Sequence, residues 1–142
     1  MLYVVDASVV LKWFLPESDS DLADQLLEAF LNNQAELIAP DLLLLEVANT
    51  LWKRVTRNDL SEREAKSAYS DLLAMPLPTV NSISLVDAAL AFSLKHHHPV
   101  YDFVYCALAV DQNCDLVTSD QALVKKLSGV FPFVRHISSI RL

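Results

Sequence analysis

Residues 1–13 read MLYVVDASVVLKW and contain, in order, a short apolar run, one aspartate and the start of a helical pattern. The run Leu2–Val5 is continuously apolar, which is typical of a strand buried on both faces of a parallel sheet. The residues from Ala7 to Phe14 then favour a helix that ends before Pro16. Asp6 therefore falls at a strand-to-helix turn, and in open α/β sheets ligands bind at this end of the strands.

Downstream of these residues, strand and helix patterns continue to alternate. Further strands are predicted at 37–39, 79–80, 115–118 and about 133–137. Helices are predicted from Ser18 or Asp19 to Leu31, and at 42–55, 61–74, 84–94, 101–112 and 121–127. This alternation predicts an α/β fold with a mainly parallel sheet covered on both faces, and no linker or repeat interrupts it. We expect residues 1–142 to form a single domain.

The composition excludes several classes of protein. Hydrophobic residues make up 53% of the chain, which is enough for a substantial core, and the net charge of −7 argues against a protein that coats nucleic acid. The charge still permits a nucleic-acid enzyme whose basic residues are local. The one glycine, Gly129, excludes the glycine-rich loops that bind ATP or dinucleotides. Asparagine, aspartate and proline are expected to form the turns instead, as in Asn32-Asn33, Asn58-Asp59 and Asn113.

Neither the cysteines nor the apolar segments indicate secretion or a membrane. Cys106 and Cys114 do not have zinc-site spacing and are predicted to be reduced thiols. The first apolar run is interrupted by Asp6 and then Lys12, so we expect no signal peptide. No stretch approaches the roughly 18 uninterrupted apolar residues of a membrane span. A cytoplasmic protein is expected.

Four carboxylates stand next to apolar segments rather than on polar helix faces: Asp6 after LYVV, Glu46 after LLLL, Asp102 before FVYCALAV and Asp120 after LVTS. Acidic side chains are rarely buried unless they are paired or bind a metal. Helix capping would account for Asp120 and is possible for Asp6, and Asp102 could be an ordinary acid of a first helical turn. Glu46 has no such explanation. Taken together, the four predict a shared site.

Electrostatics limits what four converging carboxylates can be. Two carboxylates ~4 Å apart repel by about 4 kcal/mol at an effective dielectric constant of 20. Such a cluster must be partly protonated or must bind cations. Oxygen ligands without cysteine or histidine match Mg²⁺ or Mn²⁺, which promote hydrolysis of phosphodiesters.

Four blocks of the sequence resemble the PIN-domain family: DASVVLKW (6–13), APDLLLLEVANTLWK (39–53), VYDFVYCALA (100–109) and LVTSD (116–120). Together they span almost the whole chain in the family's order, and they are most similar to the bacterial toxin ribonucleases of the VapC type. The resemblance implies a three-layer α/β/α sandwich. It also implies an endoribonuclease that uses Mg²⁺ or Mn²⁺ and a metal-activated water, without a covalent intermediate.

The resemblance also assigns residues and partners. The family's acidic quartet falls on Asp6, Glu46, Asp102 and Asp120, with Asp6 and Asp102 as the principal metal ligands. Ser8 and Thr118, or Ser119, are expected to form hydrogen bonds to these ligands. The implied partners are an RNA substrate and a small antitoxin that covers the site, and a homodimer is expected. One departure is the loop before Asp102, which often contains glycine in the family and here reads HHHP.

The remaining polar residues allow two interpretations each. His96–His98 are interpreted as a polar loop rather than a metal site, because consecutive side chains point in different directions, although one of them could contact RNA or the antitoxin. Lys53, Arg54 and Arg57 form a basic patch that could be a solvated helix end or an RNA contact, and Lys12 is a weaker candidate for such a contact.

Two other functions remain as alternatives. A PIN-like module without catalytic activity could bind and regulate a partner, although the intact quartet argues against it. A phosphotransfer protein with Asp6 as the nucleophile would usually place a second acid one or two residues later. Ala7 and Ser8 occupy those positions, which disfavours this function.

Overall fold

A computed structural model describes all residues from Met1 to Leu142 and contains one five-stranded sheet in the order β3-β2-β1-β4-β5. All four strand pairings are parallel. The elements follow one another as β1 (Leu2–Val5), α1 (Ala7–Val10), η1 (Leu11–Trp13), α2 (Ser20–Leu31), β2 (Glu36–Pro40), α3 (Leu42–Thr56), α4 (Glu62–Ala74), β3 (Thr79–Val80), η2 (Ser82–Leu85), α5 (Val86–His96), α6 (Val100–Gln112), β4 (Asp115–Thr118), α7 (Gln121–Leu127), β5 (Val134–His136) and η3 (Ile137–Ser139).

The first strand forms the centre of the sheet. Strand β1 pairs with β2 on one side, where Val4 is opposite Ile38, and with β4 on the other, where Val5 is opposite Val117. Val4, Val5 and Val117 are completely buried. Continuous burial explains why LYVV lacks the alternation of a half-exposed strand. Because the strands are parallel, the C-terminal ends of β2, β1 and β4 meet at one edge, which we call the carboxyl edge.

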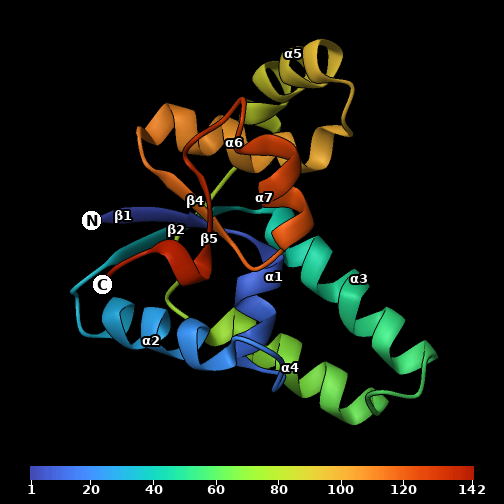
Figure 1. The fold of residues 1–142 in the computed structure, drawn as a ribbon. Helices are drawn as coiled ribbons and strands as arrows, with labels where there is room; N and C mark the ends of the chain where they lie inside the picture. Colours follow the sequence, from blue (N-terminus) through green and yellow to red (C-terminus); the bar gives the residue numbers. More distant parts are fainter.

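Helices cover the sheet on both faces, which confirms the predicted three-layer α/β/α architecture. Figure 1 shows α5 and α6 on one side of the strands and α1, α2 and α4 on the other. Helix α6 contacts β1, β2 and β4, and seven consecutive residues, Phe103–Ala109, are buried. Such all-round burial is expected of a helix between a sheet and a second helix, here α5.

Local sequence signals account for many of the helix ends and turns. Ser61 and Glu64 form the predicted capping box at the start of α4. Asn33, Asn58 and Asn113 adopt left-handed backbone conformations with φ between 50° and 58°. Asparagine tolerates this conformation better than most residues, so these three residues replace the missing glycines, as predicted.

The helix predicted to begin at Ser84 starts differently. A 3₁₀ turn begins at Ser82, and the side chain of Asn81 accepts the N–H of Ile83. Ser82 also pairs with the start of α3: its N–H donates to Asp41 Oδ1 at 2.9 Å and its hydroxyl oxygen accepts the N–H of Leu42 at 2.8 Å. The predicted helix is present as α5, and only its start differs, because this pairing joins residues about forty positions apart.

Two other helix details also differ from the sequence pattern. Asp19 precedes α2 with φ 61° and makes no capping hydrogen bond through its side chain. In α3 the buried face contains Leu43, Val47 and Leu51. Helical spacing in the sequence predicts instead an apolar stripe of Leu44, Val47, Ala48, Leu51 and Val55. In a run of four leucines the pattern does not reveal which one faces the core.

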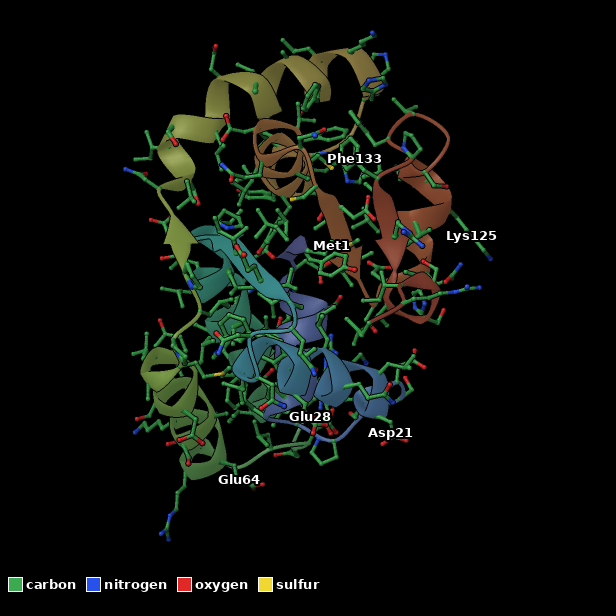
Figure 2. The ribbon with its side chains drawn as sticks, turned by 90° about the vertical axis from the view of Figure 1, so that its left-hand side faces the viewer. Met1, Asp21, Glu28, Glu64, Lys125 and Phe133 are labelled. Carbon is green, nitrogen blue, oxygen red and sulfur yellow. The ribbon has the colours of Figure 1, made fainter.

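Charged side chains of the outer helices point away from the core. Figure 2 shows Asp21, Glu28 and Lys125 on the periphery of the molecule, and all three are exposed. Cys106 and Cys114 are free thiols, as predicted. No helix has the length and apolar character needed to cross a membrane.

Candidate active site

The four acids predicted to form a site are all carried by elements that begin at the carboxyl edge. Asp6 directly follows β1, and Asp120 follows β4 after one residue, Ser119; β1 and β4 are neighbouring strands. Glu46 lies in the second turn of α3, which begins after β2. Asp102 lies in the first turn of α6, which returns the chain to the start of β4 at the opposite edge. The topology therefore directs all four acids to the same edge.

Asp6 is buried without a cationic partner. Its side chain caps α1 by accepting the N–H of Val9, at 3.3 Å from Oδ1, and the Ser8 hydroxyl donates to the same oxygen at 2.6 Å. Desolvation raises the pKa of Asp6 to about 6, against the opposing effect of hydrogen bonds from Ser8, Thr118 and Val9. The negative charge of Asp102 raises it further. A buried carboxylate that is near another carboxylate is poorly compensated.

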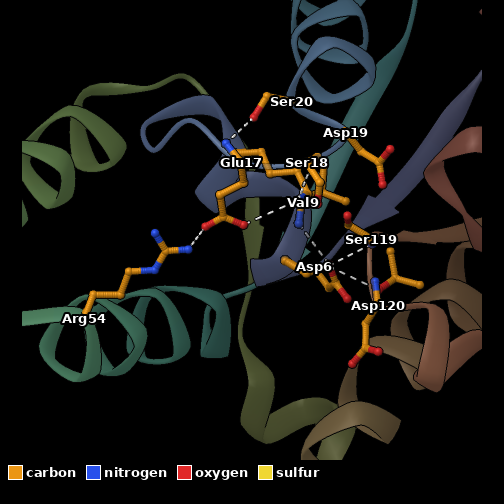
Figure 3. Close-up of polar contacts among 12 residues, drawn as sticks. Asp6, Val9, Glu17, Ser18, Asp19, Ser20, Arg54, Ser119 and Asp120 are labelled. Carbon is orange, nitrogen blue, oxygen red and sulfur yellow. Dashed lines mark hydrogen bonds and ion pairs between the residues drawn. The ribbon is translucent and has the colours of Figure 1, made fainter. Parts of the chain in front are cut away.

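Hydroxyl groups connect Asp6 with the end of β4. Ser8 Oγ lies 3.2 Å from Thr118 Oγ1 and accepts the N–H of Ser119 at 2.8 Å. Thr118 Oγ1 accepts the N–H of Asp120 at 3.1 Å. Thr118 is completely buried, and Figure 3 shows Asp6, Ser119 and Asp120 close together. This network fixes the two strand ends against each other.

Glu46 is held by a residue that the sequence analysis did not select. Tyr105 donates its hydroxyl proton to Glu46 Oε2 at 2.9 Å. Desolvation raises the pKa of Glu46 to about 7; the Tyr105 hydrogen bond opposes this shift, while the charges of Asp102 and Asp6 add to it. Burial together with the nearby carboxylates also raises the pKa of Tyr105, so it remains a hydrogen-bond donor. Tyr105 lies three residues after Asp102, a spacing that places both on one face of α6.

Asp102 is paired with His98, at a distance of 2.6 Å between Nε2 and Oδ2. The interpretation of His96–His98 as a polar loop was wrong for His96, which belongs to α5, whereas His97 and His98 do lie in the loop between α5 and α6. His96 is the last residue of α5 and packs on Phe131, and His98 packs on Phe103. His97 is the exposed residue and adopts a left-handed conformation at the end of α5. The aromatic neighbours come from distant parts of the chain, so the local sequence could not reveal them.

Asp120 is set apart from the other three acids. Its Oδ1 accepts the N–H of Leu123 at 3.1 Å, so it does cap α7. Its charge is not among those that raise the pKa of Asp6 or Glu46. The structure thus brings Asp6, Glu46 and Asp102 within electrostatic range of one another, and attaches Asp120 to them through Thr118.

These residues provide only oxygen ligands, which suits a hard divalent cation such as Mg²⁺ or Mn²⁺. A cation would offset both the desolvation that chiefly raises the pKa values of Asp6 and Glu46 and the smaller repulsion from Asp102. No group of three or more His, Cys, Asp or Glu side chains is arranged to hold a metal ion directly. This is compatible with Mg²⁺, which commonly uses one or two carboxylates and completes its coordination with water.

Two of the four basic candidates are engaged elsewhere. Lys12 is buried, and its ammonium group donates to the carbonyl oxygen of Ser18 at 2.5 Å and lies 3.4 Å from Glu17 Oε2. Arg54 forms an ion pair with the other carboxylate oxygen of Glu17, as Figure 3 shows. Lys53 and Arg57 are exposed and have no ion-pair partner.

The comparisons with known proteins agree with this architecture. The PIN domain family matches residues 3–127. Ribonuclease VapC3 of Pyrobaculum aerophilum is 35% identical over 132 residues, which cover 92% of this chain and 98% of the relative.

Two solved structures share the fold. The crystal structure of PAE2754 from Pyrobaculum aerophilum has a TM-score of 0.69 at 19% identity and covers 98% of this chain and 85% of that chain. The structure of VapBC2 from Rickettsia felis, bound to a DNA fragment from its promoter, has a TM-score of 0.65 at 15% identity and covers 96% of this chain and 97% of that chain. The family match, with the close relative, shows that this chain belongs to the PIN-domain family and is of the VapC type.

Proposed function

We propose that the protein is a divalent-metal-dependent endoribonuclease and the toxin of a toxin–antitoxin pair. The observation that carries the proposal is the group of three carboxylates at the carboxyl edge. Asp6, Glu46 and Asp102 come from three separate elements, the charge of Asp102 raises the pKa values of the other two, and no lysine or arginine pairs with any of them. Membership of the PIN-domain family, and the ribonuclease VapC3 as a relative, support RNA as the substrate.

The cation is expected to be Mg²⁺ or Mn²⁺. Asp6 and Asp102 would be its principal ligands, and Glu46 and Asp120 would complete the site directly or through water. When bound, the ion supplies activation of a water molecule for attack on phosphorus and stabilisation of the departing oxygen.

The residues around the ligands keep the carboxylates in place. Ser8 occupies Oδ1 of Asp6, and Tyr105 occupies Oε2 of Glu46. Thr118 is a further hydrogen-bond partner of Asp6, whereas the other oxygen of Glu46 has no side-chain partner. In the metal-free protein Asp6 and Glu46 hold protons up to pH values of about 6 and 7, because their pKa values are raised to those levels. A cation must displace these protons, so we expect binding to strengthen as the pH rises.

RNA contact and the partners form the finer part of the proposal. Lys53 and Arg57 are the free cations of the basic patch at the C-terminal end of α3, whereas Lys12 and Arg54 would first have to leave their common partner, Glu17. We expect a small antitoxin to cover the site and the protein to act as a homodimer in the cytoplasm. The VapBC2 complex of Rickettsia felis is a precedent in the same fold for the antitoxin partner.

The test is cleavage of a structured RNA by the purified protein. We expect cleavage with Mg²⁺ or Mn²⁺, none with EDTA, and loss of cleavage in Asp102→Asn. Asp111→Asn is a matched control, because Asp111 is an exposed acid on the same helix. Cleavage at the wild-type rate by Asp102→Asn would contradict the site assignment.

A second readout is growth of cells that express the protein. Wild-type protein should arrest growth, and Asp102→Asn should not. If the wild-type protein neither cleaves RNA with either metal nor arrests growth, a PIN-like regulatory module without activity is the better description.

A further inference from the structure

The loop between α5 and α6 buries one histidine against an acid of the proposed site. The His98 side chain is only 9% exposed, and its ring meets the edge of Phe103 at a centroid distance of 5.3 Å and an interplanar angle of 73°. Phe103 is itself completely buried and contacts Phe92 and Phe131. The imidazole is therefore held by packing as well as by its hydrogen bond to Asp102.

The hydrogen bonds around this ring define its tautomer. Nε2 lies 2.6 Å from Asp102 Oδ2, and an ionised carboxylate can only accept, so Nε2 carries the proton. Nδ1 is buried and has no partner, which suits an unprotonated nitrogen better than an unsatisfied donor. His98 thus uses its one N–H group on Asp102.

This pairing also restricts the carboxylate. The bond to His98 is the one side-chain hydrogen bond that Asp102 makes, and it takes up Oδ2. Without His98, the Asp102 side chain would be free to change rotamer in the first turn of the helix.

We propose that His98 is a positioning residue that orients Asp102 toward the cation by donating Nε2–H to Oδ2, which leaves Oδ1 for the metal. The proposal rests on the proposed function, since it assumes a cation at Asp102. Partners that orient metal ligands in this way typically change metal affinity by about 10–100-fold when they are removed.

The test compares substitutions at His98 by their affinity for Mn²⁺, measured by electron paramagnetic resonance of the free ion at fixed pH. His98→Phe keeps an aromatic ring against Phe103 but has no donor, and we expect about tenfold weaker binding. His98→Gln has an amide N–H near the position of Nε2, and we expect it to restore most of the affinity. His97→Asn is the matched control, because His97 is exposed in the same loop and asparagine suits its left-handed backbone.

The outcomes separate this proposal from the proposed function. If the wild-type protein binds Mn²⁺, Asp102→Asn loses binding and His98→Phe retains wild-type affinity, the positioning role alone is wrong. If the wild-type protein binds no Mn²⁺, or Asp102→Asn binds it normally, the metal site and the role of His98 fail together. A purely structural role would lower the thermal stability of His98→Phe and His98→Gln alike, without the recovery of affinity in the glutamine variant.

A measurement without metal provides an independent check. Nitrogen NMR of the metal-free protein should show His98 protonated at Nε2 and unprotonated at Nδ1. The opposite tautomer would overturn the proposal, because Nε2 could then not donate to Asp102.

Discussion

Asp6 and Lys12 are two almost equally buried charges near opposite ends of one short helical segment, with 8% and 7% of their surface exposed. Lys12 is fully compensated within the chain. Its ammonium group contacts the Ser18 carbonyl oxygen and Glu17, and Glu17 is shared with Arg54. Asp6 receives hydrogen bonds from Ser8 and Val9 but no positive charge, and the charge that affects it most is that of another carboxylate, Asp102.

This difference distinguishes a compensated buried charge from an uncompensated one. A buried charge costs several kcal/mol unless a partner of opposite charge offsets it. Lys12 meets this requirement and fastens the segment that leads into α2. Asp6 does not meet it, so the folded protein retains a deficit of positive charge at the carboxyl edge. A bound cation would remove that deficit.

The largest effect is expected from Asp6→Asn. Asparagine keeps an acceptor for Ser8 and Val9 but removes the charge, so the fold should persist. Loss of a residue that only orients a metal ligand typically costs ~10–100-fold in activity. Because Asp6 is proposed to be a ligand itself, RNA cleavage should fall by more than that. The free energy of unfolding at pH 8 without metal should rise by as much as about 3 kcal/mol, because a raised pKa of about 6 means that ionised Asp6 destabilises the native state.

Cleavage rates and urea unfolding of the same preparations would measure both effects. Asp21→Asn serves as the control, since Asp21 is an exposed acid on α2. Loss of activity together with a large loss of stability would show that Asp6 is a structural charge like Lys12. The proposed difference between the two residues would then be wrong.

Lys12→Met should have the reverse profile. It leaves Glu17, whose side chain is 24% exposed, with Arg54 as its remaining partner and removes the donor to the Ser18 carbonyl oxygen. We expect a loss of roughly 2–3 kcal/mol in the free energy of unfolding, measured in urea. The cleavage rate per folded molecule should stay unchanged. A selective loss of RNA cleavage at normal stability would instead favour the RNA-contact role for Lys12.

The pH dependence of stability provides a third test of whether the buried carboxylates, unlike Lys12, are uncompensated. Asp6 and Glu46 have folded pKa values of about 6 and 7, above their ordinary values of 3.8 and 4.5. Their contribution to stability is therefore complete below pH 4 and is lost as the pH rises to about 7. For Asp6 alone the loss should approach about 3 kcal/mol.

Urea unfolding in EDTA across this range would measure the loss, with an Asp6→Asn/Glu46→Gln double variant as the reference. Added Mg²⁺ should reduce the fall in stability of the wild-type protein. If the free energy of unfolding depends on pH identically in the wild-type protein and the double variant, burial does not raise the pKa values of the two carboxylates.

The overall architecture could be predicted from sequence because its signals are local. The continuous apolar run of β1, the capping box at Ser61 and the turn asparagines each act within a few residues. The start of η2 was missed because Ser82 bonds to Asp41 and Leu42, which lie about forty residues earlier. Its sequence neighbourhood contains no trace of that pairing.

The same distinction between local and long-range signals applies to the candidate site. The four acids could be selected because a carboxylate beside an apolar segment is unusual in the sequence itself. The hydrogen bond from Ser8 to Asp6 was also expected. Two other partners could not be predicted: Tyr105 lies inside an apolar helix and bonds to Glu46 across 59 positions, and His98 is defined by its burial on Phe103. One usable signal was present, namely the spacing of His98, Asp102 and Tyr105, which are four and three residues apart.

The smallest effect is expected from Tyr105→Phe, which removes one hydroxyl group from the site. The hydrogen bond from Tyr105 lowers the pKa of Glu46, so without it the pKa should rise above about 7 and the proton should compete more strongly with a cation. The loss of one buried hydrogen bond should cost about 1 kcal/mol of stability. RNA cleavage should fall several-fold at pH 7 and recover at pH 8.5, which a pH–rate profile would show. Tyr101→Phe is the control, because Tyr101 lies at an exposed position of the same helix, and it should leave the profile unchanged. If Tyr105→Phe also leaves the pH–rate profile unchanged, Glu46 is not one of the uncompensated carboxylates of the site. Asp6 and Asp102 alone would then differ from Lys12, whose charge is compensated within the chain.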